Sequence, residues 1–545
     1  MIENGFSLAE KRLRAGGRGL PFLDAVRMAI CLVIAPAAIA LAEDWPQLQH
    51  DPQRTGRSSV SVVPGYEAKW VWVDEEHVTH GFVSKKGASI RYPARRSVIL
   101  GGDVQPIVAG DRVYFGACNG EFYALNGVDG STAWKRQLGG PILHTAACGA
   151  GTVVVGCMDG RIYAFDAASG STRWTCQTGA GISVAILLLG DTIYAGSRDG
   201  TFYAVDLASG TLKWKYRTVA DSPEHPHSGA PIMQSASTDG ERIFFGAENM
   251  YFYALDARTG RELWRRKLGG QSFMYSWPVV HEGLVMTFVM VPDGLSEYKL
   301  ERELDALPGR EKNESRAEYA ARVWPEERTA IRRWLADNPS YRNFYVMRTR
   351  DGSSPFPEEV PMGRVGGIGY PGRAPVVDHE GRILLHWRTR SAVFLTGGTF
   401  GTKHTPDLGA LDPVTGDRVV LSASSPMGVE IDNNFTCTVG GDYLYFNNHM
   451  RGAHCLNLKN GGTVRATSIL ADWDGANFRN WGNRLVWISN DANPQHLPPP
   501  SVHRSPQGDC GIVLATIQGR PVMFVQESGH YQIDFGCLAA VEGAP

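Results

Sequence analysis

The chain has 545 residues, of which 43% are apolar, and its formal charge at neutral pH is −2. A length of this order accommodates several domains, but 63 glycines and 14 tryptophans indicate one large, turn-rich β protein with a well-filled core. Because acidic and basic side chains nearly balance, the composition gives no general basic surface. Nucleic acid is therefore excluded as an expected partner.

The first 42 residues have the composition of a secretory signal peptide. A leader with several Lys and Arg residues precedes an apolar run at 28–41, and the small residues Ala40 and Ala42 fit a signal-peptidase site. The run is too short to span a bilayer comfortably. We therefore expect a mature chain that starts near Glu43, has no transmembrane span and is periplasmic or secreted. An uncleaved N-terminal anchor is the alternative.

Residues 102–270 repeat one pattern four times. Phe or Ile, then Tyr, Ala, an apolar residue and Asn or Asp occur at 122–126, 162–166, 202–206 and 252–256, and each is followed by a Gly and a Trp. Trp134, Trp174 and Trp214 lie forty residues apart, and Trp264 follows after fifty, which is the period of one four-stranded β-propeller blade. In the first blade we expect strands at 110–116, 121–125 and 132–137, separated by Asn-Gly and Asp-Gly turns.

The pattern continues in degenerate form to the C-terminus. Strands are expected at 277–290 and 343–352 in blade five, 374–387 and 408–416 in blade six, 435–457 in blade seven and 512–543 in blade eight. Blade eight lacks a fourth strand, and residues 66–73 supply one, with Trp70 in the position of the repeated tryptophan. The predicted fold is all-β. Residues 43–545 form a single eight-bladed propeller closed by an N-terminal strand, which leaves no open edge.

Five long connections interrupt the blades, at 74–101, 218–230, 291–342, 389–407 and 471–509. The four strands of a blade are lettered A to D from the axis outward. Each long connection joins strand D to strand A of the next blade or strand B to strand C, and these two kinds of connection emerge on one face of the ring. We call it the insertion-rich face. Because loops carry function more often than scaffolds do, we expect binding there, with a cap that merely covers the channel as the alternative. In the 291–342 insertion we expect a helical lid of two short helices, at 314–323 and 325–337, with Pro325 starting the second.

The repeat resembles the tryptophan-docking repeat of PQQ-like (quinoprotein-type) β-propellers. The resemblance rests on residues 164–174, 204–214 and 254–264, and on an opening segment at 45–56. Propellers of this kind include pyrroloquinoline-quinone (PQQ) dehydrogenases and the non-catalytic lipoprotein of outer-membrane protein assembly. The resemblance therefore implies a fold and leaves enzyme and scaffold open.

For an enzyme, the resemblance implies a quinone stacked between a floor Trp and two adjacent bonded cysteines, with calcium held by Glu and Asn and an Asp as base. The chain has no adjacent Cys pair and no Cys-x-x-Cys-His motif for haem, so no haem is expected. Trp277 is the candidate floor residue, because the register places it on the inner strand of blade five. Glu430, Asp432 and Asn433 offer oxygen ligands for calcium, and Asp432 or Asp407 a general base. The alternative is a turn rich in Asp and Asn for backbone reasons.

Other polar residues are candidates for ligand binding because of their positions. Convergence of titratable groups at the channel mouth would form a site, whereas histidines in solvated loops are the alternative. These candidates are His144 and Gln234 near the upper ends of inner strands, His225 and His227 between blades three and four, and Lys403 and His404 in the blade-six loop.

The sequence thus favours a scaffold that binds a small molecule or an envelope protein at the insertion-rich face. A PQQ- and calcium-dependent oxidoreductase acting on an alcohol or a sugar is the second hypothesis. The two differ in what they need: an enzyme requires a deep axial pocket with a Trp floor, whereas a scaffold requires exposed surface.

Overall fold

The computed structural model describes most of the chain from Glu43 onwards. The described residues are 43–63, 67–73, 104–220, 229–274, 276–291, 304, 306–309, 311–314, 316–358, 360–362, 374–394, 400–421, 436–448, 452–459, 478–481, 484–487, 511–528 and 536–543. The expected signal peptide at 1–42 lies outside them.

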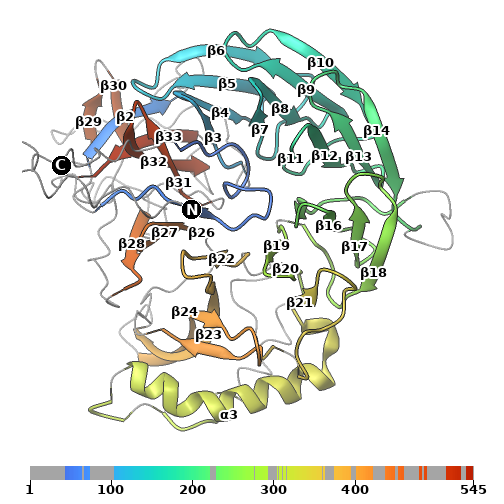
Figure 1. Cartoon of the computed structure of the whole chain (residues 1–545). Helices are drawn as coiled ribbons and strands as arrows, with labels where there is room; N and C mark the ends of the chain where they lie inside the picture. Colours follow the sequence, from blue (N-terminus) through green and yellow to red (C-terminus); the bar gives the residue numbers. More distant parts are fainter. Residues whose placement is uncertain are drawn as a thin grey trace, which may run out of the picture. The chain divides into compact units, whose positions relative to one another are not determined.

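The first four blades are regular antiparallel sheets of four strands, which run in order from the inner strand A to the outer strand D (Figure 1). The strands predicted for blade one are confirmed. The bounds are β3 (Ile107–Ala109), β4 (Arg112–Gly116), β5 (Glu121–Asn126) and β6 (Thr132–Gln137); β7 (Ala147–Gly149), β8 (Thr152–Gly156), β9 (Arg161–Asp166) and β10 (Thr172–Gln177); β11 (Leu187–Leu189), β12 (Thr192–Gly196), β13 (Thr201–Asp206) and β14 (Leu212–Arg217); and β15 (Ser237–Thr238), β16 (Arg242–Gly246), β17 (Tyr251–Asp256) and β18 (Glu262–Lys267).

The later blades follow the same order with less regular strands. Blade five has β19 (Val279–His281), β20 (Leu284–Phe288) and β21 (Phe344–Arg348); blade six has β22 (Val376–Val377), β23 (Ile383–Phe394), β24 (Phe400–Leu411) and β25 (Arg418–Val420); blade seven has β26 (Cys437–Gly440), β27 (Tyr443–Asn448) and β28 (Gly452–Asn457), with β1 (Arg57–Ser58) parallel to β26; and blade eight has β31 (Val513–Ile517), β32 (Arg520–Ser528), β33 (Gly536–Glu542) and β2 (Glu67–Val73). A separate hairpin consists of β29 (Phe478–Trp481) and β30 (Arg484–Trp487).

The ring closes as the sequence predicts, with an N-terminal strand completing the last blade. Strand β2 pairs antiparallel with β33, and Trp70 stands opposite Ala540. The Trp70 indole then donates a hydrogen bond of 2.8 Å to the carbonyl of Gly127 in blade one. The prediction of an all-β, eight-bladed propeller is thus confirmed.

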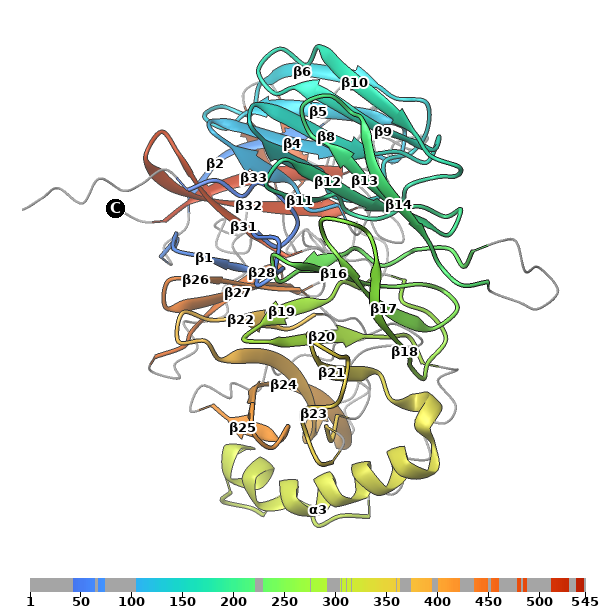
Figure 2. The same cartoon turned by 45° about the vertical axis from the view of Figure 1, so that its right-hand side comes forward.

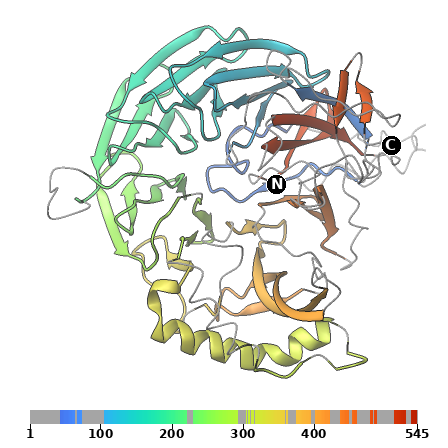
Figure 3. The same cartoon turned by 180° about the vertical axis from the view of Figure 1, so that it is seen from behind.

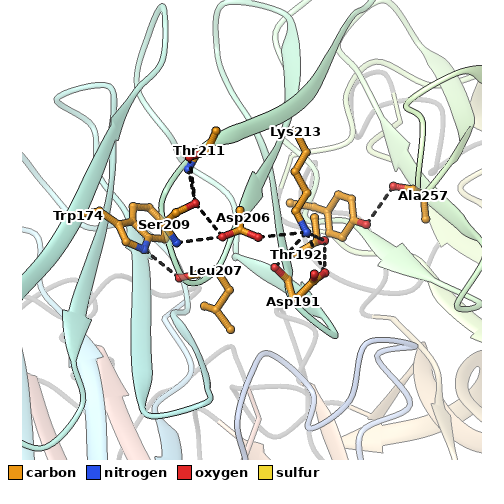
Figure 4. A network of polar contacts seen from close by, with 10 residues as sticks. Trp174, Asp191, Thr192, Asp206, Leu207, Ser209, Thr211, Lys213 and Ala257 are labelled. Carbon is orange, nitrogen blue, oxygen red and sulfur yellow. Dashed lines mark hydrogen bonds and ion pairs between the residues drawn. The ribbon is translucent and has the colours of Figure 1, made fainter.

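The repeated tryptophans join each blade to the next. Trp174, on the outer strand of blade two, donates from Nε1 to the carbonyl of Leu207 in blade three at 2.8 Å (Figure 4). Its ring lies over Gly210, whose φ is +72° and where a Cβ would meet the ring at 2.6 Å. In the same turn, Asp206 accepts hydrogen bonds from Ser209 and lies 3.4 Å from the Lys213 ammonium. Glycine is required at this turn for both its conformation and its lack of a side chain.

Apolar side chains fill the spaces between neighbouring blades. One buried cluster combines Val154 and Trp174 of blade two with Ile193 and Tyr203 of blade three, and comparable clusters join blades one and two, three and four, and four and five. Each sheet is therefore apolar on both faces, as expected for blades packed face to face.

Residues 389–407 differ from the prediction of a long loop. Strands β23 and β24, each of 12 residues, pair from Leu384 with Ala410 to Phe394 with Phe400. The segment contains several β-branched and aromatic residues, which suit extended strands. Lys403, His404 and Asp407 consequently lie on β24 and not in a loop.

The insertion between β20 and β21 contains one helix where the sequence predicts two. Helix α3 (Arg316–Asp337) continues through Pro325 and is followed by the 3₁₀ turn η1 (Pro339–Tyr341). The proline removes one helical hydrogen bond at a cost of about 3 kcal/mol. Four large buried side chains on the helix, Trp324, Ile331, Trp334 and Leu335, outweigh that cost, because each contributes about 1.5–3 kcal/mol.

Helix α3 packs against the periphery of blades five and six (Figures 1 and 2). The Trp324 indole donates to the Asp417 carboxylate at 3.1 Å and packs edge-on against Trp387, while Arg328 forms an ion pair with the same carboxylate. That the whole insertion serves as a lid over the channel mouth stays a prediction. In the described part of the chain, no helix combines the length and the apolar character needed to cross a bilayer.

Candidate functional site

Residues 43–58, which we call the axial segment, run through the middle of the ring (Figures 1 and 3). The segment accepts a hydrogen bond from one main-chain N–H in the inner strand of every blade. In blades one to three, the N–H groups of Val108, Cys148 and Leu188 donate to the carbonyls of Trp45 and Pro46 and to the side chain of Gln47, in that order. In blades four to six, those of Thr238, Val280 and Val377 donate to the carbonyls of Pro52, Gln53 and Thr55. In blades seven and eight, those of Val439 and Thr516 donate to the carbonyls of Gly56 and Glu43. The axial segment therefore makes one circuit of the channel and satisfies an edge that each blade would otherwise leave open.

Arg54 anchors this circuit by a buried charge. Its side chain is fully buried, and it donates to the carbonyls of Leu48 at 2.7 Å, Ala236 at 3.1 Å and Ile186 at 3.2 Å, and to Gln47 Oε1 at 3.3 Å. Burial lowers the pKa of the Arg54 guanidinium to about 9, since water no longer solvates the charge. The group remains protonated at neutral pH, and four oxygen acceptors replace its hydration.

A second polar layer lies mainly in the D-to-A connections, just before the inner strands begin. His144 Nδ1 accepts from the main-chain N–H of Thr145 at 2.9 Å, and its Nε2 lies 3.0 Å from the Ser235 hydroxyl. The Gln234 amide donates to the hydroxyls of Ser276 at 2.7 Å and Thr287 at 2.8 Å. The structure thus brings the predicted candidates His144 and Gln234 into one buried layer, where their hydrogen bonds connect blade two to blade four and blade four to blade five.

Gln105 connects this layer to the axial segment. Its Oε1 accepts from the Trp45 indole at 3.0 Å and from the main-chain N–H of Gln49 at 2.7 Å, and its own N–H donates to the Thr145 hydroxyl at 2.8 Å. The two layers therefore form one polar framework around the axis.

Trp277 does not fit the role of a quinone floor. Its side chain is 1% exposed and belongs to a buried apolar cluster that includes Leu48 of the axial segment and Ala185. A quinone needs one open ring face on which to stack, and here both the exposure and the packing leave none. The described residues consequently do not fit a PQQ stacked on Trp277.

The remaining predicted site residues are not gathered by the described structure. Glu430, Asp432 and Asn433, proposed as calcium ligands, and His225 and His227 lie outside the described residues. The backbone register places Lys403 opposite Ser391, His404 opposite Arg390 and Asp407 opposite Trp387. Within the ranges that the structure describes, no group of three or more His, Cys, Asp or Glu side chains has a metal-binding arrangement.

The sequence interpretation missed the residues that organise the axis, above all Gln47, Arg54 and Gln105. The sequence of residues 45–56 indicates only the opening of a propeller, because the partners of this segment are strands that lie far along the chain. One signal was available: it is a polar stretch with two prolines and no strand-like alternation, placed before the first strand of the ring.

Comparisons with known proteins agree with the propeller fold. Residues 71–225 and 218–312 match the sequence profile of the family described as outer membrane protein assembly factor BamB. The resemblance to the PQQ-like propellers is confirmed. A search of curated proteins with this sequence gives no match.

Solved structures share the propeller at low identity. A europium-containing methanol dehydrogenase is 11% identical with a TM-score of 0.55, over 92% of this chain and 98% of its own. The quinohemoprotein alcohol dehydrogenase from Comamonas testosteroni is 12% identical with a TM-score of 0.54, over 93% and 82%. BamB from Moraxella catarrhalis is 13% identical, over 82% and 99%, but its TM-score of 0.43 is too low to show a shared fold. The likenesses to the two dehydrogenases show the fold alone.

Proposed function

We propose that this PQQ-like propeller is a non-catalytic scaffold, located in the periplasm or secreted, that binds an envelope protein through its insertion-rich face. One observation carries the proposal: the polar residues nearest the axis are bonded to one another and to the axial segment. His144 and Gln234 are at most 8% exposed, and Trp277 is 1% exposed. Groups engaged in this way stabilise the ring and are poorly placed to receive a substrate.

The family profile supports the same function. The profile that matches residues 71–312 is described as an outer membrane protein assembly factor, so a protein of the cell envelope is the partner class that we propose. A small molecule bound at the insertion-rich face is the other ligand class compatible with the long connections. Loops that extend a rigid ring on one face supply adaptable contact surface for either ligand.

Site-specific photo-cross-linking in cells tests the proposed face. A photoreactive amino acid replaces Pro141, an exposed residue on the D-to-A connection from blade one to blade two, or Val128, which is 39% exposed in the C-to-D turn of blade one, on the opposite face. We expect cross-links to an envelope protein from position 141 and none from position 128. Equal cross-linking at both positions would contradict binding by the insertion-rich face.

Calorimetric titration with PQQ, with and without calcium, tests the alternative of a PQQ-dependent oxidoreductase acting on an alcohol or sugar. A scaffold is expected to show no heat of binding and no dye-linked oxidation of alcohols or sugars. Saturable, calcium-dependent binding accompanied by turnover would replace the scaffold with the enzyme.

A further inference from the structure

The inner strands of the eight blades present a ring of main-chain donors toward the axis. Eight N–H groups, one per blade, donate to the axial segment over distances of 2.8–3.1 Å. Seven of the eight acceptors are main-chain carbonyls, which any peptide possesses. Recognition of a peptide through its main chain at the exposed edges of sheets uses the same kind of contact.

Three side chains add sequence selectivity to that ring. Arg54 enters a socket formed in part by the carbonyls of Ala236 and Ile186, which belong to blades four and three. The Trp45 indole donates to Gln105, and Gln47 both donates to and accepts from the main chain of Leu188. A peptide without these groups would leave buried acceptors unsatisfied, which is the usual source of discrimination at a buried polar site.

The backbone of the axial segment has a conformation that the surrounding ring must hold. Gln49, His50 and Arg54 have φ angles of 55°, 75° and 63°, in the left-handed region that non-glycine residues rarely adopt. Such a path is not the preferred state of a free peptide. Ring contacts stabilise it together with the segment's own turns, in which the N–H of Arg54 donates to the carbonyl of Asp51 and the N–H of Gly56 to that of Gln49.

We infer that the axial channel is a peptide-binding site, that residues 43–58 are its ligand in cis, and that it binds the same peptide in trans. The segment is joined to the rest of the ring through Val63, which is 49% exposed. A cut at this connection breaks the covalent link between ligand and receptor after folding. The inference concerns the axis and is independent of the partner proposed for the insertion-rich face.

The test uses the full chain with a protease site inserted after Val63 and cut once the protein has folded. We expect the released fragment to remain with the ring in gel filtration and a fluorescein-labelled synthetic peptide of residues 43–60 to exchange into the channel, raising its anisotropy. A fragment that elutes separately from a ring of unchanged melting temperature would overturn the inference.

Competition with unlabelled variant peptides tests the selectivity. An Arg54→Ala peptide removes four hydrogen bonds and is expected to compete about 100-fold more weakly than the native peptide. A Gln53→Ala peptide keeps the main-chain carbonyl that binds Val280 and is expected to compete like the native peptide. Equal competition by the Arg54→Ala and native peptides would refute the socket.

The same two substitutions in the uncut chain provide a readout that does not depend on cleavage. The melting temperature is expected to fall in the Arg54→Ala protein and to stay at the native value in the Gln53→Ala protein. Equal melting temperatures for the two variants would overturn the inference even if the cut protein failed to remain soluble.

Discussion

Replacing Gly210 with Ala isolates the contribution of a docking tryptophan, because blade three offers a matched control. Gly210 has a φ of +72°, and a Cβ there would lie 2.6 Å from Cδ2 and 2.7 Å from Cγ of the Trp174 ring. Gly190, in another turn of the same blade, has a φ of +60° and no heavy atom within 4 Å of the position of a Cβ. Both substitutions strain the backbone, but only the first displaces the indole.

The two variants should therefore differ in free energy of unfolding. Alanine in the left-handed conformation costs about 1 kcal/mol at either position. At Gly210 the overlap with the Trp174 ring adds about 1–3 kcal/mol, the usual cost of overpacking. The overlap also displaces the hydrogen bond from the indole to Leu207. We expect Gly210→Ala to destabilise the protein by about 2–4 kcal/mol and Gly190→Ala by about 1 kcal/mol.

Guanidinium denaturation followed by tryptophan fluorescence measures the difference, with the midpoints of the two variants compared under identical conditions. A third variant, Trp174→Phe combined with Gly210→Ala, should recover part of the loss, because a smaller ring leaves room for the methyl group. Equal midpoints for Gly210→Ala and Gly190→Ala would refute the assignment of docking to this contact.

Three further predictions concern other parts of the ring. Burial raises the pKa of Glu43, but hydrogen bonds, chiefly with His50, outweigh it and lower the pKa to about 2; the resulting stabilisation is complete above the ordinary pKa of 4.5 and is lost as the pH falls toward 2. Melting temperatures across that range should fall more for the native protein than for Glu43→Gln, and parallel curves would contradict this. Asp417→Asn weakens the attachment of α3 by about 1 kcal/mol, so limited proteolysis should cut α3 faster; an unchanged rate would argue against attachment of α3 through Asp417. Burial raises the pKa of the Cys148 thiol to about 12, and maleimide should label it only after unfolding, whereas labelling of the native protein would disprove its burial.

The regular blades were predictable because each repeats the same local requirements. A left-handed Gly in the turn before strand D and a Trp four residues later recur at Gly170 and Trp174, and the structure uses both as the repeat implies. Closure by β2 was also predictable, since a ring of blades with one strand missing has only one remaining segment of the right pattern. The repeat is encoded by local sequence patterns, and the closure follows from the number of strands in the last blade.

The predictions that failed concern features that depend on contacts between distant residues, which no local pattern encodes. Pro325 normally ends a helix, yet here burial of side chains on both sides of it stabilises one continuous helix. Residues 389–407 contain turn-like glycines and polar residues, but the partner strand extends the hairpin through most of them. Arg54 resembles a surface residue in the sequence, and only the assembled ring shows that it is fully buried.

The pairing of β2 with β33 also has a consequence for how the protein folds. Glu67 stands opposite Glu542, so this contact joins positions separated by most of the chain. The entropic cost of closing so large a loop grows only slowly, by about 0.6 kcal/mol for each doubling of its length, and the final stability suffers little. The rate is affected far more, because contacts of such high order form late. The first residues of the ring to be synthesised therefore wait for the last ones, and the sheet edges stay open until the C-terminal strand arrives.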